Sequence, residues 1–203
     1  SERAWVLLGS ESLQTLGGSG FLQDYPLEQY VRDAKIDTLY EGTTAIQGQD
    51  LFFRKIVRDN GRALQLVSAE IEAWLEIEGP FTTERALLAQ GAQDCALMAA
   101  TLSRRLMAAQ TQAPEIYTVG LNTTRLLMCL GDLVCAWLML RGGEVAQAAL
   151  DRSELSASDR DFYAGKVAAA KWFAHHQLPH LAAERKILEA TDLEVMNLPE
   201  TAF

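Results

Sequence analysis

The chain has 203 residues, 49% of them hydrophobic and 22% charged, which is the composition of a globular protein with one sizeable core or two small ones. Lysine and arginine number 18 against 27 aspartate and glutamate residues, so the formal net charge is −9. A chain this acidic lacks the clustered cations that phosphate contacts need, which argues against a nucleic-acid-binding surface.

Two helices are predicted near the N-terminus. The first covers residues 4–16 and ends at the glycine-rich stretch 17–20, because glycine adopts the conformation that terminates helices. Pro26 suits a first helical turn, and the apolar residues that follow it recur at helical spacing. A second helix is therefore predicted over residues 26–36.

A long third helix is predicted after a short loop at residues 37–41. Thr43 is its expected N-cap, and the apolar pattern continues to residue 75 before the stop at 78–80. Residues 59–61 read Asp-Asn-Gly, and asparagine and glycine are poor helix formers. A bend or a domain boundary is expected at this point.

The rest of the chain has helical periodicity and no convincing strand pattern. Helices are predicted over 83–112, 115–141, 144–150 and 158–177. Their expected stops are Ala113-Pro114, Arg141-Gly142-Gly143 and Leu178-Pro179, and residues 156–159 read as a capping start. Long helices with short connections predict an all-α fold of up-down helical bundles.

Several classes of site and segment are not expected. The longest apolar run, 126–140, is shorter than the roughly 20 residues of a membrane span, and no secretion signal is visible, so a cytoplasmic protein is predicted. The three cysteines have no spacing typical of metal or disulfide frameworks and are expected to be reduced and buried. His176, His180 and Glu184 share one helical spacing, but Pro179 interrupts it, so no metal site is predicted.

Three motifs in fixed order occupy residues 14–47. They read Gln14-Thr-Leu-Gly-Gly-Ser-Gly-Phe21, Tyr30-Val-Arg-Asp-Ala-Lys-Ile36 and Tyr40-Glu-Gly-Thr-Thr-Ala-Ile-Gln47. Taken singly, they are a helix stop, a solvated helix face and an acid near a helix N-terminus. Together and in this order, they resemble the C-terminal helical domain of the flavin-dependent acyl-CoA dehydrogenases.

The resemblance implies that Glu41 is the catalytic base of an acyl-CoA dehydrogenase. It would remove the α-proton of the acyl-CoA thioester, and desolvation by the bound acyl chain and flavin would raise its pKa toward that task. The Glu41 N–H would donate to the thioester oxygen. Gly42 is the predicted substrate-binding residue, because a Cβ there would crowd the thioester.

The resemblance also implies a flavin adenine dinucleotide (FAD) site. Thr43 matches a flavin-contacting threonine, whereas Ala45 stands where several relatives carry glutamine, so a side-chain hydrogen bond is lost there. Gln14, Gly17 and Gly18 resemble the element that reaches the FAD of a neighbouring subunit. The complete site would then require a homo-oligomer.

The family resemblance covers the chain unevenly. Residues 1–58 resemble the end of the family's C-terminal helical domain. Residues 59–190 resemble the additional helical domain of large bacterial members, of either the 3-methylmercaptopropionyl-CoA type or the broad-chain fatty acyl-CoA type, and residues 191–203 form a tail. No stretch resembles the middle β domain that holds the flavin, so the chain is expected to be inactive alone. In the whole enzyme, an electron-transferring flavoprotein is the expected partner. The alternative is a non-catalytic helical oligomerisation module. Such a module would not require the Glu-Gly-Thr sequence at residues 41–43.

Overall fold

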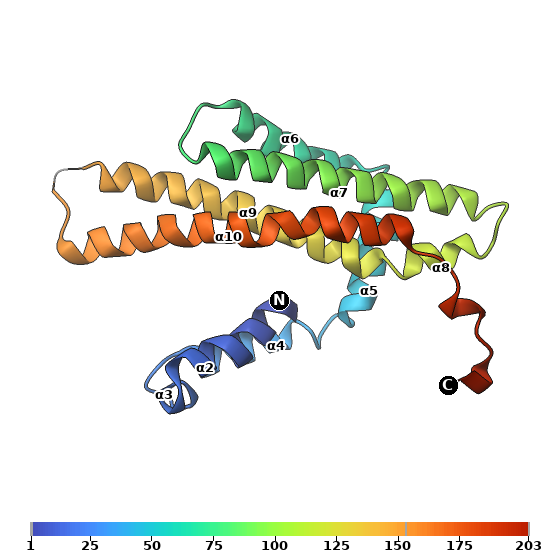
Figure 1. Cartoon of the computed structure of the whole chain (residues 1–203), viewed down its shortest axis with the longest axis horizontal. Coiled ribbons are helices and arrows are strands. Elements are labelled where there is room, and N and C mark those ends of the chain that lie inside the picture. The colour runs from blue at the N-terminus through green and yellow to red at the C-terminus, as the bar shows by residue number, and fades with distance from the viewer. Residues whose placement is uncertain (1, 153, 203) are drawn as a thin grey trace. The chain divides into compact units, whose positions relative to one another are not determined.

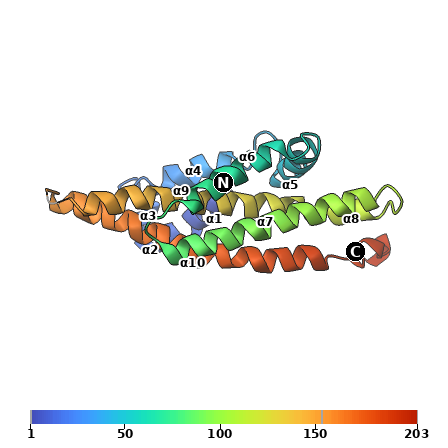
Figure 2. The same cartoon turned by 90° about the horizontal axis from the view of Figure 1, so that it is seen from above.

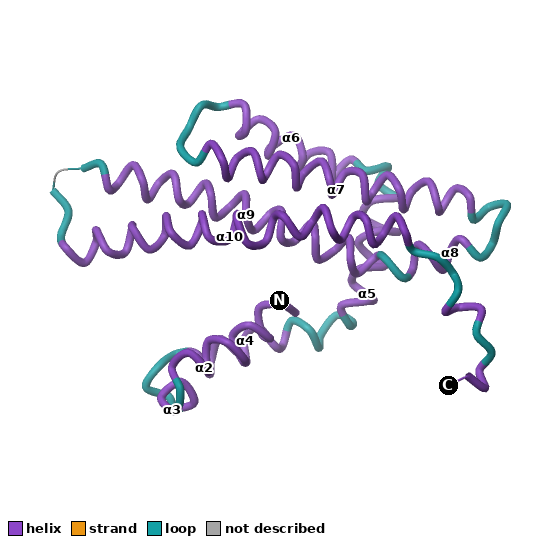
Figure 3. The backbone as a smooth tube through the Cα atoms, in the orientation of Figure 1, coloured by secondary structure: helices purple, strands orange, loops and turns teal. Residues whose placement is uncertain are grey.

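A computed structural model describes residues 2–152 and 154–202 of the chain. Over these residues every regular element is a helix, so the predicted all-α class is confirmed (Figures 1 and 3). The chain divides into two compact units, one up to Asp50 and one from Leu51 onward. The predicted division at 58/59 stays a prediction.

The first unit is built from short helices that carry the three motifs. Its elements are α1 (Glu2–Leu7), η1 (Leu8–Ser12), α2 (Leu13–Leu16), α3 (Gly18–Phe21), α4 (Leu27–Ile36) and α5 (Thr44–Gln49). The α1–η1–α2 segment and α4 confirm the two predicted N-terminal helices. The sequence predicted only a stop at the glycines, but the chain turns at Gly17 and starts a new helical turn at Gly18.

The second unit contains an up-down bundle. Its elements are η2 (Asp50–Val57), α6 (Arg62–Glu76), α7 (Thr82–Ala108), α8 (Glu115–Gly120), α9 (Thr123–Leu150), α10 (Ala157–Ala190), η3 (Val195–Asn197) and η4 (Glu200–Ala202). The helices α7, α9 and α10 alternate in direction and lie side by side, with α6 against α7 (Figures 1 and 2). Their facing sides hold most of the buried apolar core.

The weak point predicted at residues 59–61 is a real break. Helix η2 ends at Val57, and both Asn60 (φ 54°) and Gly61 (φ 74°) adopt the left-handed conformation. Asp59 stabilises the start of the next helix, because its carboxylate accepts the backbone N–H of Ala63 in the first turn of α6 at 2.7 Å. The helix predicted from residue 43 to residue 75 is therefore interrupted, with α5 and η2 before the break and α6 after it.

The predicted helix stop at Gly142-Gly143 is wrong, since α9 runs through both glycines to Leu150. A Cβ on Gly143 would lie 3.1 Å from the Phe81 ring and 3.2 Å from the Ala170 Cβ. Gly143 therefore allows close packing of α9 against α10, and that packing keeps the helix continuous. The real break lies earlier, at residues 121–122, where the buried Asn122 amide donates to the Thr118 carbonyl at 2.9 Å.

The predicted stop at Pro179 is also wrong. Helix α10 continues through this proline to Ala190, although proline removes one helical hydrogen bond. On either side of Pro179, Leu178 and Leu181 are fully buried against Gly91 of α7, where an added Cβ would meet both leucines within 3.3 Å. Burial of both leucines outweighs the local cost. The predicted capping start is confirmed, since the Ser156 hydroxyl accepts the Asp159 N–H at 3.1 Å.

Helix α9 is apolar over more of its length than the predicted run of 126–140. The segment Glu115–Leu150 is long and apolar enough to cross a membrane by length and composition alone, but a buried core helix meets the same test. Only 33% of its most apolar window is buried. Two of the three cysteines are buried as predicted, Cys95 of α7 and Cys129 of α9. Cys135 of α9 is exposed, so the prediction that all three are buried is wrong for this residue. Burial raises the pKa of the Cys95 thiol, helped by nearby Cys129 and Asp94.

Candidate functional site

The loop between α4 and α5 carries the predicted catalytic residue. It begins as a closed turn, because the backbone N–H groups of Leu39 and Tyr40 both donate to the Ile36 carbonyl. The Tyr40 hydroxyl donates to the Asp37 carboxylate at 2.9 Å. This hydrogen bond and the charge of Asp37 raise the pKa of Tyr40 above its ordinary value. Glu41 therefore follows directly after a turn that is closed by backbone and side-chain hydrogen bonds.

Glu41 and Gly42 both have left-handed backbone conformations, with φ values of 59° and 98°. Such a conformation is unfavourable for a residue with a side chain, and non-glycine residues in it concentrate at functional sites. Gly42 is required for a second reason that the sequence did not reveal. A Cβ at position 42 would lie 2.9 Å from Cγ2 and 3.1 Å from Cβ of Ile46. The loop thus fits tightly against the first turn of α5.

Both functional groups of Glu41 are accessible. Its side chain is exposed, and no acceptor among residues 2–152 and 154–202 takes its backbone N–H. One residue therefore offers a carboxylate and a free donor side by side. A water-free environment for this pair has to come from groups that bind over the loop.

Thr43 and Ala45 lie just beyond this loop. Thr43 is the N-cap of α5, as predicted, and its hydroxyl oxygen accepts the Ile46 N–H at 3.5 Å. Its hydroxyl proton stays available for another acceptor. Ala45 is exposed and offers only a methyl group. Of these two residues, Thr43 alone can make a side-chain hydrogen bond to a cofactor.

The three predicted cofactor residues of the first motif line one cavity. Gln14, Gly17 and Gly18 share a cavity of about 510 Å³ with Gly9, Ser10, Leu13 and Phe21. The Gln14 side chain makes no hydrogen bond to any described residue, so its amide is available. A Cβ added to Gly17 (φ 60°) or to Gly18 would meet nothing within 4 Å, which leaves the backbone open to the cavity. The cavity has the volume and polar groups for a portion of a dinucleotide.

The glycines of this motif differ in what a side chain would meet. At Gly20 a Cβ would lie 2.6 Å from the Leu13 carbonyl oxygen, whereas at Gly18 it would meet nothing within 4 Å. We expect Gly20→Ala to destabilise the first unit by about 1–3 kcal/mol through overpacking, and Gly18→Ala to leave its stability unchanged or slightly higher. The rate of amide hydrogen exchange in α2 and α4 measures the stability of the first unit in both variants. Equal exchange in the two variants would contradict this packing.

The predicted residues form two separate clusters within the first unit. The cavity with Gln14, Gly17 and Gly18 is lined by residues 9–21, which include α2 and the two ends of α3, whereas the segment from Glu41 to Ala45 leads into α5. Figure 1 shows α2 and α3 at one end of the first unit and α5 at the other. No residue of the second cluster lines the cavity. A hydrogen bond of 2.7 Å from the Thr44 hydroxyl to the Glu2 carboxylate ties the start of α5 to α1.

Sequence reasoning missed the role of Gln47. Its side-chain amide donates to the Gly42 carbonyl at 3.1 Å and lies 3.5 Å from the Asp37 carbonyl. Gln47 closes the Tyr40–Gln47 motif, one turn beyond the helix cap, and this position in the motif is the signal that could have identified it. The family resemblance assigns roles only as far as position 45.

Two of the three histidines contact other side chains. His175 Nε2 lies 2.9 Å from the buried Glu84 carboxylate, and the His176 ring stacks on Trp172 with 4.7 Å between centroids. Among the described residues, no three metal-binding side chains gather in one place. The reason given from sequence was wrong, because Pro179 does not interrupt α10.

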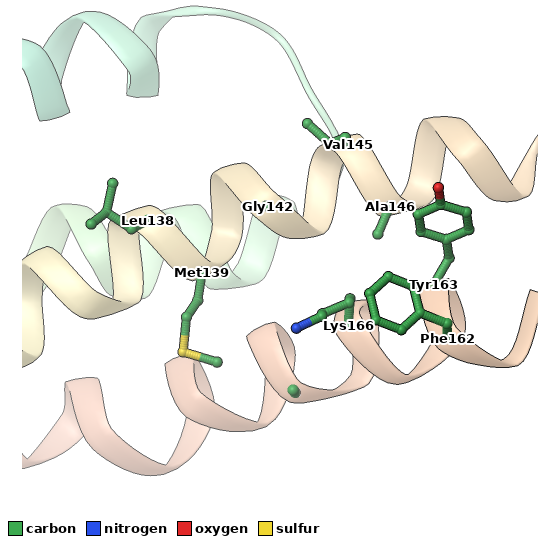
Figure 4. A pocket seen from close by; sticks show the side chains of 9 residues that line it. Leu138, Met139, Gly142, Val145, Ala146, Phe162, Tyr163 and Lys166 are labelled. Carbon is green, nitrogen blue, oxygen red and sulfur yellow. The ribbon is translucent and has the colours of Figure 1, made fainter. Parts of the chain in front are cut away.

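A larger apolar groove lies in the second unit, between α9 and α10. Its volume is about 550 Å³, and Leu138, Met139, Phe162 and Tyr163 are among its lining (Figure 4). Lys166 is its one charged lining residue. None of the predicted site residues belongs to this groove.

Comparison with known proteins gives two family matches. Residues 1–54 match the family described as "Acyl-CoA dehydrogenase, C-terminal domain", and residues 67–199 match "Acetyl-CoA dehydrogenase C-terminal like". The first match covers the first compact unit, and the second match covers most of the second unit.

Individual relatives carry consistent names. The chain is 54% identical over its full length to the broad-specificity linear acyl-CoA dehydrogenase FadE5 of Mycobacterium tuberculosis, covering 33% of that protein. It is 30% identical over its full length to a butyryl-CoA dehydrogenase of Syntrophomonas wolfei, covering 32% of it. It is 33% identical over 94% of its length to the 3-methylmercaptopropionyl-CoA dehydrogenase of Ruegeria pomeroyi, covering 31% of it.

The chain thus spans about a third of the length of each relative. The match to "Acetyl-CoA dehydrogenase C-terminal like" covers residues 67–199, which is well over half of the present chain. The chain therefore belongs to the acyl-CoA dehydrogenase family, of which it matches the C-terminal part.

Proposed function

We propose that this chain is the C-terminal third of a flavin-dependent acyl-CoA dehydrogenase subunit, in which Glu41 removes the α-proton of an acyl-CoA thioester. The observation that carries the proposal is the pair of accessible groups on Glu41, a carboxylate beside a backbone N–H without an acceptor among the described residues. The strained left-handed conformation of Glu41 adds support, because the fold maintains it at a cost.

The reaction requires two hydrogens to leave adjacent carbons. The α-hydrogen leaves as a proton to the Glu41 carboxylate, and the β-hydrogen leaves as hydride, so the electron pair of the α C–H bond forms the double bond of a 2-enoyl-CoA. FAD, when bound, supplies the acceptor for that hydride. The Glu41 N–H donates to the thioester carbonyl oxygen, where negative charge develops as the proton leaves.

The cofactor residues of the chain serve two FAD molecules. Thr43 donates its free hydroxyl proton to the flavin that works with Glu41 of the same subunit. The family resemblance implies that Gln14, Gly17 and Gly18 would contact the FAD of a neighbouring subunit. This division is supported by the cavity that these three residues line, because no residue of the Glu41–Ala45 segment lines it. This division makes the active form a homo-oligomer.

The isolated chain is inactive under this proposal. Within residues 2–50 no large apolar side chain is buried, while Val6, Leu7, Phe21 and Ile36 are among those exposed. Exposed apolar surface of this extent indicates an interface that the rest of the subunit covers. An electron-transferring flavoprotein as electron acceptor and a cytoplasmic location follow from the family likeness.

The visible spectrum of the full-length subunit tests the proposal. We expect the subunit to contain FAD and its absorption to bleach when an acyl-CoA is added anaerobically, with 2-enoyl-CoA as product. We expect the present chain alone to remain colourless after incubation with FAD and gel filtration. A full-length subunit without flavin, or a flavin that no member of an acyl-CoA panel bleaches, would contradict the proposed reaction.

A further inference from the structure

One side chain spans the loop that presents Glu41. The amide nitrogen of Gln47 donates to the Gly42 carbonyl at 3.1 Å and lies 3.5 Å from the Asp37 carbonyl. These carbonyls lie on opposite sides of Glu41 in the chain. A primary amide carries two N–H donors, so one side chain can hold both carbonyls at once.

The loop needs such support because its backbone is unfavourable. Glu41 and Gly42 are consecutive left-handed residues, and Glu41 has no backbone hydrogen bond of its own among the described residues. Neither carbonyl receives another hydrogen bond from a described residue. The Gln47 side chain thus supplies the cross-link between the start and the end of the loop.

The side chain of Gln47 is not needed for the helix itself. Its backbone N–H already donates to the Thr43 carbonyl at 2.9 Å, and Thr43 caps the helix independently. The side chain is half-buried against the loop. Its hydrogen bonds therefore act on the loop, and through the loop on the direction of the Glu41 carboxylate and N–H.

We propose that Gln47 is a positioning residue for Glu41, holding both groups of the base in register for α-proton removal. This inference rests on the proposed function. Misplacement of a reacting group by about 1 Å can lower a rate by about 100-fold. Loss of the Gln47 donors should therefore lower kcat and leave acyl-CoA binding, which depends on other contacts, largely intact.

The test compares Gln47→Met with Gln49→Met in the full-length subunit. Methionine matches glutamine in length and lacks its donors, and Gln49 is an exposed residue of the same helix. We expect Gln47→Met to lower kcat about 10- to 100-fold with KM and FAD content within twofold of the control. We also expect backbone amides of residues 38–43 to exchange hydrogen at least tenfold faster in Gln47→Met alone.

Two results would overturn the inference. One is a kcat for Gln47→Met within twofold of the Gln49→Met value, and the other is unchanged exchange across residues 38–43. Failure of the proposed function has a different signature, since the unmutated subunit would then form no 2-enoyl-CoA. The exchange measurement still tests the Gln47 contact in that case, because it needs no turnover.

Discussion

Glu41→Gln lowers the kcat of the full-length subunit for α,β-dehydrogenation by about 100- to 10,000-fold, which is the expected loss for removal of a general base. Glutamine keeps the size of the side chain and the backbone N–H, but its amide does not accept a proton at neutral pH. FAD should stay bound, because the proposed cofactor residues Gln14, Gly17, Gly18 and Thr43 are unchanged. Stopped-flow bleaching of the flavin by acyl-CoA measures the chemical step directly.

The matched control is Glu72→Gln, which makes the same change at an exposed position of α6. Its kcat should equal that of the unmutated subunit within twofold. Glu41→Asp retains a carboxylate but withdraws it by one methylene, so its rate should lie between those of Glu41→Gln and the unmutated subunit. Turnover by Glu41→Gln at the control rate would rule out Glu41 as the base and would favour the non-catalytic assembly module.

The largest expected effect on stability is at Arg85. This buried arginine lies in the first turn of α7, and it donates to the carbonyls of Trp74, Ile77 and Pro80, at and beyond the C-terminal end of α6, at 2.9–3.0 Å. It also pairs with the Glu144 carboxylate and stacks on the Trp74 ring, with 3.8 Å between its Cζ and the ring centroid. Arg85→Met leaves the half-buried Glu144 carboxylate with only its hydrogen bond from Trp74 Nε1, and it leaves three carbonyls without this donor. We expect the free energy of unfolding to fall by about 3–5 kcal/mol.

Urea unfolding of the chain, followed by far-ultraviolet circular dichroism, measures this loss. Arg104→Met is the control, because Arg104 is exposed and has one long hydrogen bond of 3.3 Å to Thr101. That change should cost less than about 0.5 kcal/mol. Arg85→Lys should be intermediate, since an ammonium lacks the planar fork that reaches several carbonyls. If Arg85→Met and Arg104→Met unfold at the same urea concentration, Arg85 does not hold α6, α7 and α9 together.

Local sequence was a good guide where a single segment decides its own structure. Thr43 and Ser156 were identified as helix caps because each hydroxyl bonds an N–H only three residues away. The break at residues 59–61 was predicted because asparagine and glycine accept the left-handed conformation found there. The motif that contains Glu41 was found because its order and spacing are contiguous in the chain.

Local sequence failed where a distant element decides the outcome. Pro179 and Gly142-Gly143 are helix breakers by propensity, but the helices that carry them are held by Leu178, Leu181 and Gly143 against neighbouring helices. Propensity amounts to about 1 kcal/mol for glycine and about 3 for proline, which the burial of two leucines can offset. No pattern within a single helix shows which residues of another helix it will meet.

The candidate site divides in the same way. The order and spacing of the motifs carried the family resemblance that nominated Glu41, Gly42, Thr43 and the glycines of the first motif, and their roles stay predictions. The tertiary structure alone placed Gln47 across the loop, set Ile46 against Gly42, and separated the cavity of Gln14 from Glu41. These relations depend on the path of the backbone through left-handed turns, and hydrogen bonds between residues five to ten positions apart fix that path only once the chain has folded.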